Sequence, residues 1–249
     1  MILIKTDEEI EGIRKAARVV AEVLEYLREI VKPGVMTKEV DAKIKEFIES
    51  RGGYPAFLGY RGYPASSCIS LNDEVVHGIP GSRRIKEGDL VKVDVGVNLN
   101  GYIGDAAITI IVGDVPPRVR KLVETTERAL YNGISQAYPG NRLSDISHAI
   151  QITAEKEGFS VVRELRGHGV GLKLHEEPFI PNYGPSGRGP ILKRGMTLAL
   201  EPMVNMGRPH VKTKKDGWTV VTKDGSLSAH FEHTIAILDN GPEILSKIS

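Results

Sequence analysis

The chain of 249 residues is long enough to bury a sizeable hydrophobic core, as one large domain or two small ones. Its 33 Lys and Arg nearly balance its 32 Asp and Glu, so the composition predicts no basic surface for nucleic acid. A single cysteine excludes an internal disulfide framework and is typical of a reducing cytosol. The N-terminus becomes acidic after four residues, unlike a signal peptide, and no apolar run approaches the roughly 18 residues of a membrane span. We therefore expect a cytoplasmic protein with no membrane or nucleic-acid partner.

Two amphipathic helices are predicted at the start of the chain. Thr6 and Glu9 have capping-box spacing, and the apolar residues behind them recur at alternating steps of three and four. Pro33-Gly34 ends this first helix. Thr37 is predicted to cap the second helix, which ends at Gly52-Gly53.

Residues 89–112 form two alternating runs around an Asn-Gly turn signal, which predicts a β-hairpin. Asp94 and Asp105 share one face in two registers: they pair directly if the turn is centred on Leu99-Asn100, and diagonally if it is centred on Asn100-Gly101. Two facing carboxylates repel, so that one takes a proton or a cation lies between them. The alternative interpretation is a solvated sheet edge.

A second pair of helices follows the hairpin. Pro116-Pro117 begins the first, which Pro139-Gly140 ends, and Ser144 is predicted to cap the second, which ends at Gly158. Shifting the chain by about 106 residues superposes the two Pro-Gly stops, which favours an internal duplication over a chance overlay of helical patterns.

We expect a single domain over residues 1–249, with related halves at approximately 1–113 and 114–249. Helices and strands in both halves predict an α+β fold in which the helices cover one face of a largely antiparallel sheet.

Three more candidate ligands lie in the second half. Glu201 ends an expected strand that Pro202 holds extended, Glu232 lies in a later strand, and His168 lies on a glycine-rich segment. With Asp94 and Asp105 they form an oxygen-rich, cysteine-free set that suits Mn²⁺, Fe²⁺, Co²⁺ or Zn²⁺ rather than a structural zinc. Five ligands are more than one ion needs, so we expect a dinuclear site.

A series of ordered motifs extends through the chain: Leu58-Gly-Tyr-Arg-Gly-Tyr-Pro64, Cys68-Ile-Ser-Leu-Asn72, His77-Gly-Ile-Pro80, Asp94-Val-Gly, Gly104-Asp105, Gly167-His168-Gly-Val-Gly171, His175-Glu-Glu-Pro178, Glu201-Pro202 and Phe231-Glu232-His233. Together they resemble the type I methionine aminopeptidases over essentially the whole chain. The resemblance implies the pita-bread metallopeptidase fold, with two related α/β halves and helices covering a curved sheet. It makes the single domain catalytic.

The resemblance implies removal of the N-terminal methionine from peptides and nascent proteins, by attack of a metal-bridging hydroxide on the first peptide bond. It implies two divalent ions (Co, Mn, Fe or Zn), with the following ligands: Asp94 on one ion, His168 and Glu201 on the other, and Asp105 and Glu232 bridging both. Glu201 would also be the general base. His175 would stabilise the tetrahedral intermediate, and His77 would contact the amide nitrogen beyond the scissile bond.

Further positions match the family's substrate pocket and a monovalent-cation site. The pocket positions are Tyr60, Tyr63, Cys68 and Trp218, on which a thioether packs well. At positions 57 and 174 some relatives have residues other than Phe57 and Leu174. The resemblance therefore implies the shape of the pocket less directly than it implies the metal site. Asn72 and Ser228 match a monovalent-cation site of some relatives.

Several residues also have a plainer interpretation. Without the resemblance, His77 and His175 would be ordinary loop histidines, and the pocket tyrosines and tryptophan would be core or loop anchors. The remaining histidines receive no ligand role: His148, His210, His230 and His233.

Two other functions remain open at this stage. One is an Xaa-Pro aminopeptidase or prolidase of the same fold, although those usually have a separate N-terminal domain. The other is a non-catalytic pita-bread binding protein, although such proteins lose metal ligands. We expect a monomer that meets nascent chains through transient ribosome contact, without the zinc module of a cysteine-rich N-terminal extension.

Overall fold

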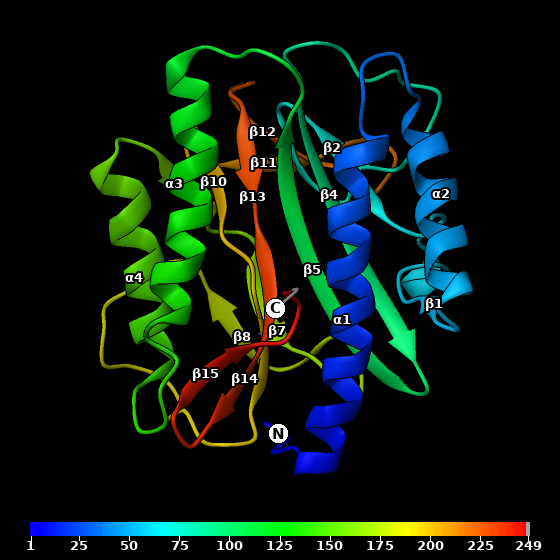
Figure 1. Ribbon diagram of the computed structural model, residues 1–249. Helices are drawn as coiled ribbons and strands as arrows, with labels where there is room; N and C mark the ends of the chain where they lie inside the picture. Colours follow the sequence, from blue (N-terminus) through cyan, green and yellow to red (C-terminus); the bar gives the residue numbers. More distant parts are fainter. Residues whose placement is uncertain (248–249) are drawn as a thin grey trace.

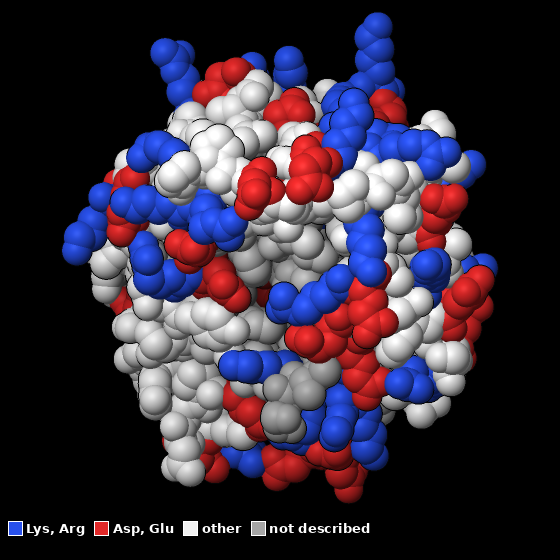
Figure 2. Space-filling model, turned by 45° about the horizontal axis from the view of Figure 1, so that its top comes forward, with Lys and Arg blue, Asp and Glu red and all other residues white. Residues whose placement is uncertain are grey.

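The computed structural model describes residues 1–247, and Figure 1 shows that the helices lie together in front of one face of a curved sheet. The four α-helices are α1 (Asp7–Ile30), α2 (Thr37–Ser50), α3 (Pro117–Ile134) and α4 (Leu143–Lys156), with a short 3₁₀ helix at Tyr60–Gly62. None of the helices in this part of the chain is long and apolar enough to cross a membrane. On the face in Figure 2, acidic and basic side chains are interspersed, in keeping with their balanced numbers.

The central sheet contains nine strands in the order β1-β4-β5-β14-β9-β7-β8, with β15 beside β14 and β2 beside β4. Two three-stranded sheets, β13-β10-β6 and β11-β12-β3, complete the fold. The strands are β1 (Tyr54–Pro55), β2 (Cys68–Leu71), β3 (Glu74–Val76), β4 (Leu90–Leu99), β5 (Tyr102–Ile111), β6 (Ser160–Val161), β7 (Arg166–Gly169), β8 (Glu176–Pro181), β9 (Thr197–Leu200), β10 (Met203–Asn205), β11 (Val211–Thr213), β12 (Val220–Thr222), β13 (Ser228–His230), β14 (Glu232–Leu238) and β15 (Gly241–Ile244). Neighbouring strands pair antiparallel, so the predicted α+β class is confirmed.

Two hydrophobic clusters fill the space between helices and sheet, one in each half. The first packs α1 and α2 on β4, and the second packs α3 and α4 on β9 and β14. Representative buried members are Val20, Leu27, Ile44 and Val93 in the first cluster, and Leu130, Ile146, Leu198 and Ile235 in the second. Because strand side chains alternate, the opposite face of the central strands is left for polar residues.

The predicted hairpin is formed by β4 and β5, with the turn at Asn100-Gly101. Both turn residues have positive φ, 53° and 87°, which an Asn-Gly pair tolerates in a type I′ hairpin. Asp94 therefore pairs with Ala107, and Gly96 pairs with Asp105. Of the two registers that the sequence left open, the structure has the diagonal one.

The helix starts agree with the sequence for α1 and differ for α2. The capping box of Thr6 and Glu9 is present. Thr37, predicted as a cap, is instead the first residue of α2, and its hydroxyl accepts the N–H of Gly81 at 2.8 Å. Met36 is the N-cap because a β-bridge to Arg84 keeps it extended.

The same difference occurs at α4. Ser144, predicted as its cap, lies in the first turn and accepts the N–H of Arg188 at 2.6 Å. Arg142 is the N-cap, because a β-bridge to Ile191 keeps it extended. A hydroxyl near a helix start cannot reveal such a bridge, which forms between distant segments.

The second and fourth helices are related in length and position. Both α2 and α4 contain 14 residues, and the residue before each forms a β-bridge. These parallels agree with the duplicated pattern of the sequence. The common origin of the two halves stays a prediction.

Close packing of α1 on β5 depends on Gly104. A Cβ at this position would overlap the backbone of Ala17, which cannot swing aside as a flexible side chain can. The absence of a side chain therefore sets the distance between this helix and the strand that bears Asp105.

We expect Gly104→Ala to lower the free energy of unfolding by about 3 kcal/mol, because overpacking here moves the backbone. The matched control is Gly34→Ala, where a Cβ meets open space and only the φ of +89° is strained, at about 1 kcal/mol. Urea unfolding measures both. Equal losses in the two variants would contradict the close helix–strand contact.

Candidate metal centre

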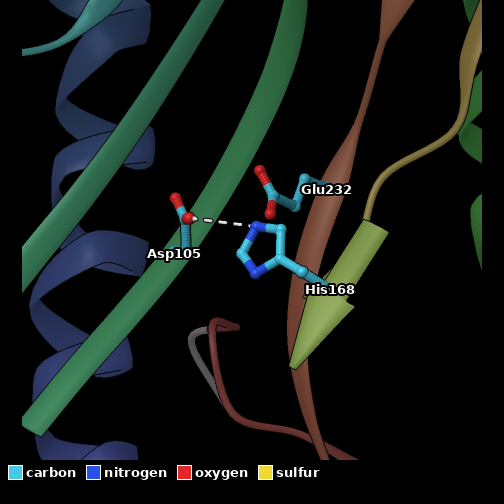
Figure 3. A group of neighbouring side chains, drawn as sticks. All are labelled: Asp105, His168 and Glu232. Carbon is cyan, nitrogen blue, oxygen red and sulfur yellow. Dashed lines mark ion pairs between the residues drawn. The ribbon is translucent and has the colours of Figure 1, made fainter. Parts of the chain in front are cut away.

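Five adjacent strands of the central sheet each bring one polar residue to the same region. In sheet order these residues are Asp94 (β4), Asp105 (β5), Glu232 (β14), Glu201 (directly after β9) and His168 (β7). All five line one cavity of about 150 Å³. Figure 3 shows three of them, from three strands, pointing toward one another.

Strand pairing explains why residues so far apart in sequence meet. Ala107, the partner of Asp94, also pairs with Glu232, so β4, β5 and β14 are in register at this level. In the pairing of β7 with β9, His168 lies opposite Ala199. Glu201 comes two residues after Ala199 in the chain and therefore lies near His168. The hydrophobic side chains that alternate with these residues face the helices, so the polar ones face the cavity.

His168 presents a free ring nitrogen to the acids. Its Nδ1 lies 2.9 Å from the carbonyl oxygen of Gly169, so Nδ1 bears the hydrogen and donates it. Its Nε2 lies 3.5 Å from Oε1 of Glu201 and 3.9 Å from Oδ2 of Asp105. Burial lowers the pKa of His168 to about 4, so at neutral pH Nε2 has a lone pair available to a metal.

The carboxylates are buried together without enough hydrogen bonds to compensate. Burial raises the pKa of Asp94 to about 7. Burial, followed by repulsion from neighbouring acids, raises the pKa values of Asp105, Glu201 and Glu232 well above their ordinary values. Three buried carboxylate oxygens have no hydrogen-bond partner among residues 1–247: Oδ1 of Asp94, Oδ1 of Asp105 and Oε1 of Glu232.

This donor set fits divalent cations. Ligand atoms of Asp105, His168 and Glu232 all lie within 4.8 Å of one another. Carboxylate oxygens with one neutral imidazole are ligands that Mn²⁺, Fe²⁺, Co²⁺ and Zn²⁺ accept. Positive charge between the acids would relieve the repulsion that raises their pKa values.

The aromatic residues predicted for the substrate pocket line the same cavity. Tyr63 and Trp218 meet edge to face with ring centroids 5.1 Å apart. The hydroxyl of Tyr63 donates toward the carbonyls of Ser67 and Gly78, at 3.1 and 3.0 Å. The full wall combines Tyr60, Tyr63, Cys68 and Trp218 with Phe57 and Leu174.

His77 and His175 also line the cavity. The ring of His175 stacks on Tyr60, with 5.2 Å between centroids, and its Nδ1 lies 2.9 Å from the Tyr60 hydroxyl. The ring centroids of His168 and His175 are 4.2 Å apart. Burial lowers the pKa of both His77 and His175, so both rings are neutral at pH 7.

The structure places two further residues at the site: Arg61, which the sequence analysis did not single out, and His230, which it gave no ligand role. Arg61 lines the cavity, and its guanidinium lies 5.3 Å from the ring centroid of Tyr60. His230 is buried, and its Nε2 lies 3.8 Å from Oε2 of Glu201. The alternation of side chains offered a signal for His230, because it lies two residues before Glu232.

The other histidines lie outside the cavity wall and have different partners. His148 Nδ1 lies 3.1 Å from the carbonyl oxygen of Gly184, His233 Nδ1 lies 2.8 Å from the Ser246 hydroxyl, and His210 is exposed. That these three histidines have no ligand role stays a prediction.

Asn72 and Ser228, the predicted monovalent-cation residues, are neighbours. The N–H of Ser228 donates to the carbonyl of Asn72 at 3.1 Å. The carbonyl of Asn72 and the carbonyl of Ser228 each accept a hydrogen bond from Nζ of Lys92, at 2.7 and 3.1 Å. The cation role of the pair stays a prediction.

Comparison with known proteins identifies the family. The family described as metallopeptidase family M24 matches residues 11–239. The chain belongs to this family. It is 54% identical to methionine aminopeptidase 1 of Bacillus subtilis, with 100% of both chains covered, and 50% identical to the methionine aminopeptidase of Aquifex aeolicus, with 98% of each covered.

Solved structures agree with this assignment. Methionine aminopeptidase from Thermotoga maritima superposes with a TM-score of 0.98 at 50% identity over 100% of both chains. Prolidase from Pyrococcus furiosus gives 0.81 at 28% identity, covering 99% of this chain and 66% of that one. The resemblance to the methionine aminopeptidases and the pita-bread fold are thereby confirmed.

In metal-free protein at neutral pH, we expect Glu232→Gln to raise Tm by about 2–4 °C, or about 1 kcal/mol, because the amide removes the free-energy cost of burying an acid beside Asp105 and Glu201, the same cost that raises the pKa of Glu232. Added Mn²⁺ should raise Tm of the unchanged protein more than that of the variant, which lacks one anionic ligand. Calorimetry with and without chelator measures both effects. Exposed Glu46→Gln is the control, and a lower metal-free Tm for Glu232→Gln would refute the repulsion argument.

Proposed function

We propose that the chain removes the N-terminal methionine from peptides and nascent proteins. The observation that supports this most directly is one cavity that joins five candidate ligands to a wall of tyrosine, tryptophan and cysteine. The full-length identity to proteins named methionine aminopeptidase supports the same activity.

Two divalent ions would be held by the residues of the donor set: Asp94, Asp105, His168, Glu201 and Glu232. Ions bound there supply Lewis acidity and make water a strong nucleophile at neutral pH. Asp105 lies between Asp94 and Glu232 in sheet order, which suits it to bridging. Glu232 lies between Asp105 and Glu201 and suits the same role.

Glu201 is the proposed general base, which takes a proton from water as the peptide carbonyl is attacked. Its side chain is less completely buried than those of Asp105 and Glu232, at 15% exposure against 5% for Asp105. Burial raises its pKa, which makes its carboxylate a stronger base.

Two histidines are proposed to bind the reacting peptide bond. His175 is neutral, and its Nδ1 lies 2.9 Å from the Tyr60 hydroxyl. In the proposed tautomer Tyr60 donates to Nδ1 and the ring hydrogen lies on Nε2. That hydrogen would stabilise the carbonyl oxygen as it gains negative charge. His77 would contact the amide nitrogen beyond the scissile bond.

The pocket wall is suited to an unbranched thioether. Methionine sulfur packs favourably on aromatic edges, which Tyr60, Tyr63 and Trp218 provide, and beside the Cys68 thiol. The single cysteine is buried, which suits a reducing cytoplasm. We further propose a monomer that meets nascent chains at the ribosome transiently.

The test compares Met-Ala-Ser, Met-Lys-Ser and Ala-Pro-Ser on metal-depleted protein, before and after addition of Mn²⁺, Fe²⁺, Co²⁺ or Zn²⁺. We expect methionine release from Met-Ala-Ser alone, and only with metal. Full activity in thoroughly depleted protein would overturn the metal mechanism. Preferential cleavage of Ala-Pro-Ser would indicate an Xaa-Pro peptidase, and no cleavage with metal bound would indicate a binding protein.

Glu201→Gln should lower kcat for Met-Ala-Ser by at least ~10²–10⁴-fold, the range of a lost general base. The amide keeps the shape and removes the basicity, and it also weakens metal binding, so kcat is compared at saturating Mn²⁺. Glu164→Gln, at an exposed residue that does not line the cavity, is the matched control. A near-normal kcat for Glu201→Gln would assign the base role elsewhere.

A further inference from the structure

Lys92 is an unusual residue for the centre of a sheet. It lies in β4, two positions before Asp94, and is only 1% exposed, which makes it one of the largest fully buried side chains of the protein. Lysine is almost never fully buried unless its nitrogen has partners. The partners of Nζ are backbone carbonyls: Asn72 at 2.7 Å and Ser228 at 3.1 Å.

The two carbonyls come from opposite halves of the chain and are held in fixed positions. Asn72 lies in the β2–β3 turn with φ 58°, and its amide donates to Asp89 at 2.9 Å while its side-chain oxygen accepts the N–H of Leu90 at 3.0 Å. Ser228 begins β13, and its hydroxyl donates to Oδ1 of Asn205 at 2.9 Å. Neither carbonyl can turn away without breaking these contacts.

Fixed backbone carbonyls that converge on one point are the arrangement in which proteins bind dehydrated alkali ions. In this protein the point where the two carbonyls converge is occupied by Nζ of Lys92. Only two N–H donors are needed for the two carbonyls, so the contacts do not depend on whether the amine holds its third proton.

We propose that Nζ of Lys92 is a tethered donor, which occupies the position where the carbonyls of Asn72 and Ser228 would otherwise bind K⁺ or Na⁺. The tether fastens the strand of Asp94 to β13, which leads directly into Glu232. The two halves of the metal centre are thereby joined without a dissociable ion. This role concerns folding stability and is independent of the proposed peptidase activity.

The test measures Tm in KCl, NaCl or tetramethylammonium chloride at equal ionic strength, with the same Mn²⁺ concentration throughout. The unchanged protein should give one Tm in all three salts. Lys92→Ser empties the position and should lower Tm in tetramethylammonium by about 5–10 °C, since two buried carbonyls each lose one donor. K⁺ or Na⁺ should restore about 3–6 °C at ten times its dissociation constant.

Two matched variants separate ion binding from general destabilisation. Lys92→Met fills the space with hydrocarbon, and Val93→Ala opens a cavity at the next residue, which faces the helices. Both should lower Tm without any response to the salt. Lys92→Ser could be unfolded in tetramethylammonium chloride, in which case no Tm can be measured. The refolding yield of this variant in KCl is then compared with its yield in tetramethylammonium chloride.

The proposal is overturned if Lys92→Ser responds no more to K⁺ and Na⁺ than Val93→Ala does, by Tm or by refolding yield. It is also overturned if the unchanged protein is stabilised by K⁺ or Na⁺ as strongly as Lys92→Ser.

Discussion

Electrostatic repulsion among buried carboxylates is the constraint on which the rest of this structure depends. Four acids face one cavity. Burial raises the pKa values of all four, and repulsion from neighbouring acids raises those of Asp105, Glu201 and Glu232 further. Such an arrangement persists only if the surrounding fold is stable enough to hold it. The two hydrophobic clusters on the opposite face of the sheet provide that stability, and Gly104 permits the close approach of α1 that one of them requires.

Local patterns in the sequence predicted much of the fold. The alternation of residues 89–112 placed Asp94 and Asp105 on one face, and the Thr6–Glu9 capping box began the first helix correctly. The sequence did not decide the register of the hairpin. A turn centred on Leu99-Asn100 and one centred on Asn100-Gly101 both keep the two acids on one face. Positive φ at Asn100 and Gly101, which this residue pair tolerates, decides between them.

The remaining features depend on contacts between distant segments. Thr37 and Ser144 looked like caps, but β-bridges to Arg84 and Ile191 fix the residues before each helix. The position of His230 behind Glu201 follows from the pairing of strands and not from a motif. The five candidate ligands were predicted as an oxygen-rich set on expected strands, and the motif resemblance implied their individual roles. Their adjacency, in contrast, arises from the order of strands in the sheet.

The strand order also has a consequence for the sequence of folding events. Asp105 lies in a strand joined to β14 by hydrogen bonds with Thr234, 129 residues away. Contacts of such high sequence separation form late, after the loop-closure entropy has been overcome. The complete set of candidate ligands is therefore assembled only when the two halves have docked. Metal capture should follow chain collapse rather than nucleate it, because an emerging polypeptide lacks Glu232 beside Asp105 until β14 is synthesised.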